Sequence, residues 1–144
     1  MHELSVAEAE YLLVGAYAVA THVIPRSTGD IDLWVRPEIE NARRVHLALA
    51  RFGAPISNLS PEELAKPGFI YQIGVAPVRI DILTAIDGVT FEEAWPDRAL
   101  TSLFGVQVPV LSRKHLLMNK RATGRLKDLA DVALLEGTEP GEHT

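Results

Sequence analysis

The chain has 144 residues and a formal net charge of −5 at pH 7, with 47% hydrophobic and 23% charged residues. These values are typical of one compact globular domain and exclude an intrinsically disordered chain. No apolar run reaches the roughly 20 residues of a membrane-spanning helix, and the acidic first segment does not resemble a secretory signal. The chain has no cysteine, which excludes disulfides and thiolate metal sites, so we expect a cytoplasmic protein.

The charge is spread unevenly along the chain. Residues 112–131 carry six Lys or Arg against two Asp, a local balance of +4, which leaves −9 for the remainder. An acidic body with a basic helical end would hold a metal on one side and an anion on the other. Two solvated faces would give the same distribution, so charge alone leaves both interpretations open.

The first part of the chain predicts alternating helices and strands. A capping-box spacing over residues 5–8 predicts the start of a short helix. In chain order we then expect a buried strand over 11–14 ended by Gly15, a helix over 16–22, a loop over 24–30, a strand over 30–35, and a helix over 37–52 stopped by Gly53.

The second part predicts a hairpin, short strands and two final helices. We expect a brief helix at 60–63, strands over 68–75 and 78–85 joined as a hairpin, a helix from Thr90 to about residue 98, one or two strands within 103–112, and helices over 112–122 and 125–135 separated by Gly124. Residues 137–144 read as a polar tail. This order predicts a single α/β (α+β) domain over residues 1–144, with a small mixed β-sheet flanked by helices.

Two carboxylates stand at the start of the expected strand 30–35. Residues i and i+2 of a strand share a face, so Asp30 and Asp32 project together, roughly 6–7 Å apart. Ile31 and Leu33 then point into the core. Carboxylates this close repel each other unless a cation lies between them, and Mg²⁺ pairs with one or two carboxylates and substrate phosphates. Alternatively, Asp30 caps the turn at residues 28–29.

A third carboxylate, Asp81, lies between Ile80 and Ile82 in an otherwise apolar strand. Aspartate is a poor strand former and a poor core residue, so it needs a partner. A neighbouring metal-bearing strand would supply one, and an ion pair with Arg79 is the structural alternative. We refer to Asp30, Asp32 and Asp81 as the carboxylate triad.

Gly15 lies where a strand passes directly into a helix. Backbone N–H groups at a helix N-terminus bind phosphate, and glycine permits a close approach. One glycine is weak evidence, because any strand-to-helix turn can use one. In the basic run over 113–127, Leu116, Leu117 and Leu126 are expected to pack while most charges are solvated.

These motifs together resemble the nucleotidyltransferase superfamily that includes DNA polymerase beta. The shared pattern is a glycine motif, here Gly15-Ala16, then an Asp-x-Asp on the next strand and a third carboxylate on a later strand. The string Arg26-Ser-Thr28-Gly-Asp30-Ile-Asp32 and the late Lys127-Asp128-Leu-Ala-Asp131 resemble small bacterial and archaeal members, including nucleotidyltransferases associated with toxin–antitoxin pairs. The likeness covers nearly the whole chain.

The resemblance implies a metal-dependent enzyme that moves a nucleoside monophosphate from a nucleoside triphosphate, such as ATP, to an acceptor hydroxyl on a protein, an RNA or a small molecule. The triad would be catalytic and would bind two Mg²⁺ ions. The implied nucleotide- and phosphate-binding residues are Gly15, Ala16, Arg26, Thr28, Lys120 and Lys127.

This chain departs from the family pattern at Ala16, where a serine or glycine is usual, and in its small size. The alternative function is therefore a weakly active or inactive binding module, for example one half of a toxin–antitoxin pair. A homodimer or a heteromeric partner would complete the cleft of so small a domain. A nucleic-acid-binding role without chemistry ranks lower, because the net charge of −5 opposes a broad phosphate-binding surface.

Overall fold

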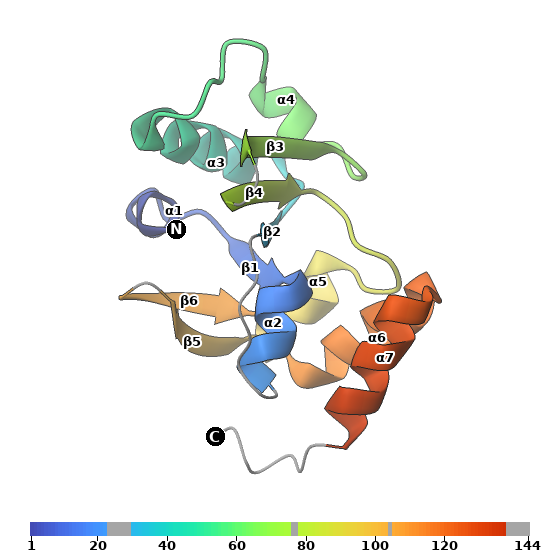
Figure 1. The fold of residues 1–144 in the computed structure, drawn as a ribbon. Helices are drawn as coiled ribbons and strands as arrows, with labels where there is room; N and C mark the ends of the chain where they lie inside the picture. Colours follow the sequence, from blue (N-terminus) through green and yellow to red (C-terminus); the bar gives the residue numbers. More distant parts are fainter. Residues whose placement is uncertain (23–29, 76–77, 104, 138–144) are drawn as a thin grey trace.

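The computed structural model describes residues 1–22, 30–75, 78–103 and 105–137 (Figure 1). Its helices are α1 (His2–Val6), α2 (Gly15–His22), α3 (Ile39–Phe52), α4 (Pro61–Leu64), α5 (Phe91–Ala94), the 3₁₀ helix η1 (Trp95–Asp97), α6 (Arg113–Thr123) and α7 (Leu126–Glu136). Its strands are β1 (Tyr11–Val14), β2 (Asp30–Val35), β3 (Ile70–Val75), β4 (Val78–Leu83), β5 (Ala99–Leu103) and β6 (Val106–Val110).

The strands form one mixed sheet in the order β3-β4-β2-β1-β6-β5. The pairs β3–β4, β1–β2 and β5–β6 are antiparallel, whereas β2–β4 and β1–β6 are parallel. The predicted α/β class with a mixed sheet flanked by helices is therefore confirmed. Strand β1 lies inside the sheet with all of its residues buried, as its continuous apolar sequence requires.

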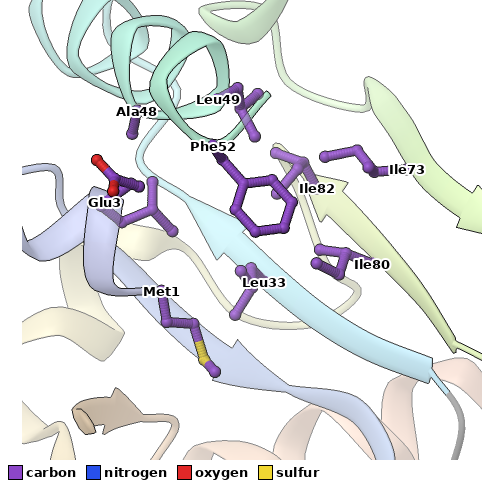
Figure 2. A pocket seen from close by; sticks show the side chains of 10 residues that line it. Met1, Glu3, Leu33, Ala48, Leu49, Phe52, Ile73, Ile80 and Ile82 are labelled. Atoms are coloured by element: carbon purple, nitrogen blue, oxygen red, sulfur yellow. The ribbon is translucent and has the colours of Figure 1, made fainter. Parts of the chain in front are cut away.

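The two faces of β2 and β4 have different roles. Leu33 and Ile82 point to one face, where they meet α1 and α3 around a small apolar pocket of about 30 Å³ (Figure 2). In this view the ring of Phe52, at the end of α3, lies over the strands. The alternate residues point to the opposite face, on the side of α2, α6 and α7. One face is thus core, which leaves the other available for a site.

Several element boundaries differ from the sequence expectation. Ser5 lies within α1 rather than capping it, because the helix already begins at His2, and Glu8 has a positive φ of 58° after its end. Pro37 precedes the N-cap of α3, Glu38. The helix capped by Thr90 ends at Ala94 and continues as a 3₁₀ turn, because Pro96 has no N–H to extend it.

The other predicted helices and strands are present, whereas residues 24–29 of the predicted loop lie outside the described residues. The 68–85 hairpin forms as β3 and β4, Ser112 caps α6 through the N–H of His115, and Gly124 ends that helix in the left-handed conformation. Strand β5 begins at Ala99, earlier than expected. Among the described residues, no helix is long and apolar enough to cross a membrane. The predicted tail from residue 138 onward lies outside the described residues.

Mutation of Leu13, which lies in the inner strand β1, can test the packing of this core. It is fully buried in β1, so Leu13→Ala is expected to lower the free energy of unfolding by about 3 kcal/mol. Leu100→Ala, at a leucine of β5 that is 61% exposed, is the matched control and should cost less than about 0.5 kcal/mol. Urea unfolding measures both, and equal losses would contradict the placement of β1.

Candidate functional site

The carboxylates meet because β2 and β4 are adjacent and parallel. Asp32 lies directly opposite Asp81 in the register, and Asp30 lies opposite Arg79. These four side chains therefore share one face of the sheet, since residues two apart on each strand point the same way. The prediction that Ile31 and Leu33 enter the core is also confirmed, because both are buried.

Arg79 bridges two members of the triad. Its Nη2 lies 3.2 Å from Oδ2 of Asp30, and its Nε lies 3.3 Å from Oδ1 of Asp81. The second contact is an ion pair and not a hydrogen bond. Both of its atoms are buried, and neither has a hydrogen-bond partner. Asp81 thus pairs with Arg79, as the structural alternative predicted. The same arginine also pairs with Asp30, so this ion pair is part of the triad site.

Asp32 has a strongly perturbed acidity. Burial, followed by the negative charges of Asp81 and Asp30, raises its pKa to about 6, and a hydrogen bond with Asp81 favours the protonated form further. The positive charge of Lys120 opposes this rise. Burial is the largest cause of the raised pKa, and the further rise caused by Asp81 and Asp30 indicates that the three acids lack positive charge when no metal is bound.

Gly15 fits against the same carboxylate. It opens α2 directly after β1 with a φ of +72°, a left-handed conformation that glycine adopts readily. A Cβ at this position would lie 2.2 Å from Oδ2 of Asp32. The predicted glycine turn and the predicted Asp-x-Asp are therefore in contact, and only a residue without a side chain fits between them.

A cleft of about 420 Å³ brings most predicted site residues together. We call it the triad cleft. Its lining includes Gly15, Ala16, Asp30, Asp32, Asp81, Asp87, Asn119, Lys120, Thr123, Arg125, Lys127, Asp128 and Asp131. The triad and both predicted lysines thus face one space. The two remaining predicted residues, Arg26 and Thr28, lie outside the described residues.

The two predicted lysines have different environments. Lys120 is buried, and its Nζ lies 3.0 Å from Oδ1 of Asp128 and 3.5 Å from Oδ2 of Asp131. Although burial acts to raise the pKa of Asp128, hydrogen bonds from Thr123, Lys120 and others lower it to about 2. Lys127 is exposed at the cleft wall. A cation such as Lys127 can contact a ligand, whereas Lys120 is held by the protein.

The donor set fits a divalent metal in its chemistry. It consists of carboxylate oxygens, the ligands that Mg²⁺ prefers, and Oδ1 of Asp81 is buried without a hydrogen bond. No group of His, Asp or Glu within the described ranges is already arranged as a three-ligand metal site. The guanidinium of Arg79 instead pairs with Asp30 and Asp81.

A second cleft adjoins the first and was missed from sequence. It has a volume of about 510 Å³ and shares Ala85 and Ile86 with the triad cleft. Trp34 and Phe91 line it and pack edge to face, with ring centroids 5.1 Å apart. Arg36 lies over the Phe91 ring at 4.8 Å. The spacing of aromatic residues gave no signal for this wall, because its rings come from different elements.

The acidity of Asp32 predicts a pH-dependent stability. Folding raises the pKa of Asp32 from 3.8 to about 6. The protonated side chain therefore makes its whole contribution to the free energy of unfolding below pH 3.8, and this contribution is lost as the pH rises through about 6. Asp32→Asn stays neutral, so in chelator it should be more stable than the unmodified protein above that pH by on the order of 2 kcal/mol. The gain should disappear near pH 3.8. Urea unfolding across this range measures it.

Asp87→Asn is the control, because Asp87 is exposed in the same cleft. It should show little pH-dependent gain. A gain from Asp32→Asn that is constant across the range would contradict the raised pKa.

The contact between Gly15 and Asp32 gives a second prediction. Gly15→Ala should lower the free energy of unfolding by about 2–3 kcal/mol, because it adds a clash to an unfavourable φ. Gly68→Ala is the control, since Gly68 has a φ of +85° with nothing within 4 Å of an added Cβ. It should cost about 1 kcal/mol. Equal losses in urea unfolding would show that the carboxylate does not press on Gly15.

Comparison with known proteins identifies the fold. No protein-family model and no curated protein sequence matches the chain. Among solved structures, the lincosamide antibiotic adenylyltransferase LnuA with bound lincomycin is 13% identical, with a TM-score of 0.56 over 98% of this chain and 91% of that chain. The antibiotic-resistance factor ANT(2'')-Ia is 15% identical, with a TM-score of 0.56 over 93% of this chain and 79% of that chain.

A third similar structure is TM1012 of Thermotoga maritima, a protein provisionally assigned as a nucleotidyltransferase. It is 14% identical, with a TM-score of 0.56 over 94% of this chain and 85% of that chain. All three neighbours match nearly the whole chain at low identity, so the likeness concerns the fold. The chain has the nucleotidyltransferase fold, as its motifs predicted.

Proposed function

We propose that the protein is a metal-dependent nucleotidyltransferase that moves a nucleoside monophosphate from a nucleoside triphosphate to an acceptor hydroxyl. The observation that carries the proposal is the triad cleft, in which three carboxylates from two adjacent strands face a helix N-terminus and an exposed lysine. The fold shared with nucleotidyltransferases supports the same activity.

The phosphates would bind at the start of α2. Gly15 and Ala16 line the triad cleft at a helix N-terminus, where backbone N–H groups and the helix dipole favour negative charge. Ala16 supplies no hydroxyl, so the phosphates depend on these amides and on Lys127. Arg26 and Thr28 remain predicted phosphate contacts. Lys120 would act through its charge, because Asp128 and Asp131 already hold its ammonium group.

The triad would hold Mg²⁺, which when bound neutralises the acids and the triphosphate and polarises the reacting oxygens. Arg79 would release Asp30 and Asp81 at that stage. We assign Asp81 to accept the acceptor's proton, because it lies opposite Asp32 in the sheet and lines the same cleft. The acceptor oxygen then bonds to the α-phosphorus, the bond from that phosphorus to the bridging oxygen breaks, and pyrophosphate leaves.

The acceptor would lie in the second cleft. This cleft adjoins the triad cleft at Ala85 and Ile86, and its volume of about 510 Å³ falls in the range of small-molecule sites. Two structural neighbours are named for antibiotics, one with lincomycin bound, which makes hydroxylated small molecules the first acceptors to test. Protein and RNA acceptors follow in the same assay.

Nucleotide binding tests this function before the acceptor is known. Calorimetric titration with ATP, GTP, CTP and UTP, with Mg²⁺ and then with chelator, should show binding that requires the metal. Asp32→Asn and Asp81→Asn should weaken it at least about 10-fold, since each removes a negatively charged metal ligand. Transfer of label from α-phosphate-labelled nucleotide to lincomycin, total RNA or the protein itself should fall by about 100-fold or more.

Asp87→Asn is the matched control, because it removes an exposed carboxylate of the same cleft outside the triad. It should keep metal-dependent binding. Unchanged nucleotide binding in both triad variants would overturn the proposed site. No binding of any nucleotide by a folded sample would favour the alternative, a module that acts through a protein partner such as the other half of a toxin–antitoxin pair.

A further inference from the structure

Arg79 is held between two carboxylates of the triad by weak contacts. Its Nη2 donates a hydrogen bond of 3.2 Å to Oδ2 of Asp30, whereas its Nε lies 3.3 Å from Oδ1 of Asp81 without forming a hydrogen bond. The side chain of Arg79 is 37% exposed, and that of Asp30 is 50% exposed. Ion pairs this exposed contribute little to stability, so little free energy opposes the release of Arg79.

Two buried atoms in this arrangement lack hydrogen bonds. They are Nε of Arg79 and Oδ1 of Asp81, and neither has a hydrogen-bond partner among the described residues. A buried polar atom without a partner is unfavourable, and most such atoms in proteins are satisfied. If Asp81 bound a metal ion and the guanidinium moved into solvent, both atoms would gain a partner. This exchange would therefore relieve two unfavourable groups at once.

The register of the sheet leaves room for Arg79 to move. Its direct neighbour on β2 is Asp30, and its direct neighbour on β3 is Gly74, which is exposed. Residues directly opposite each other in a sheet share a face, and glycine has no side chain to occupy that face. The guanidinium can thus turn away from Asp30 toward Gly74 without displacing the side chain of an opposite residue.

Lys120 shows, by comparison, how a fixed cation is held in the same cleft. It is buried, and its Nζ lies 3.0 Å from Asp128 and 3.5 Å from Asp131, both of which are buried as well. Arg79 has neither this burial nor a hydrogen bond to each of its two carboxylates. Of the two cations, Arg79 is therefore the one suited to leave.

We propose that Arg79 is an internal competitor for the metal site of the triad. Its guanidinium pairs with Asp30 and Asp81 until a divalent cation takes these carboxylates, and it thereby lowers the affinity of the triad for that cation. Exchange of one positive charge for two is favourable among three carboxylates, whereas a monovalent ion would bring no more charge than Arg79 already supplies. The inference rests on the metal site of the proposed function but not on nucleotide transfer.

Titration of the full chain with Mn²⁺, without nucleotide, measures this competition when the free ion is followed by electron paramagnetic resonance. Mn²⁺ suits the same oxygen ligands as Mg²⁺. Arg79→Gln should lower the Kd for Mn²⁺ by about 10-fold, because it removes a positive charge from beside the ligands. Arg79→Lys keeps the charge, so its Kd should stay closer to that of the unmodified protein. If Arg79 instead positioned the carboxylates for the metal, Arg79→Gln would bind Mn²⁺ more weakly, and the proposal would be overturned.

Arg121→Gln is the matched control for charge. It removes an arginine from an exposed ion pair with Glu136, and neither residue lines the triad cleft. Its Kd for Mn²⁺ should equal that of the unmodified protein.

Urea unfolding gives a second measurement, which also detects a variant that folds poorly. In chelator, Arg79→Gln should be less stable than the unmodified protein, because Asp30 and Asp81 lose their counter-ion. The same concentration of Mg²⁺ should then stabilise the variant more than the unmodified protein, since the tighter ligand gives the larger gain. A variant that folds only with Mg²⁺ would show the same effect in a stronger form. Equal gains from Mg²⁺ would contradict the competition.

The outcomes also separate this inference from the proposed function. Equal affinity for Mn²⁺ in the unmodified protein and in Arg79→Gln would overturn the competition and leave the metal site intact. If neither protein bound Mn²⁺, or if Asp81→Asn bound it as tightly as the unmodified protein, the metal site of the proposed function would fail and the inference with it.

Discussion

The parallel pairing of β2 with β4 is the constraint on which the site depends. It sets Asp32 directly opposite Asp81, so the fold holds two carboxylates together that repel each other. Arg79, on the same face, offsets part of this repulsion through Asp30 and Asp81. Asp32 has no such ion pair among the described residues, and burial, followed by the charges of Asp81 and Asp30, raises its pKa to about 6. Such a site favours the binding of a cation.

Helix α7 connects this site to the molecular surface. Its inner face supplies Asp128 and Asp131, which fix Lys120 at the cleft, and its outer face exposes Leu126 and Leu129. The sequence expectation that Leu126 packs inside the domain is therefore wrong, because its side chain is 88% exposed.

The sequence predicted most elements because turn residues and periodicity act locally. Gly15, Gly53 and Gly124 all mark the boundaries expected of them, and the Asp30–Asp32 alternation follows from strand geometry alone. Residues joined by tertiary structure were not predictable in this way. No spacing shows that Arg79 reaches Asp30, or that Phe91 packs between Trp34 and Trp95. The resemblance in motifs, rather than periodicity, placed Asp81 with the pair.

Lys120 and Lys127, which the sequence analysis both assigned to phosphate binding, differ in burial. Moving Lys120 onto a phosphate would take one direct partner from Asp128, which is fully buried and would keep only Arg125 and Thr123. The loss of such a hydrogen bond to a charged group costs about 1.5–3 kcal/mol. Its ammonium group therefore stays in place and acts on the site through its field, as its effect on the pKa of Asp32 shows. Lys127 carries no such cost, because its side chain is exposed. Of these two lysines, we therefore propose Lys127 for direct contact with a bound phosphate.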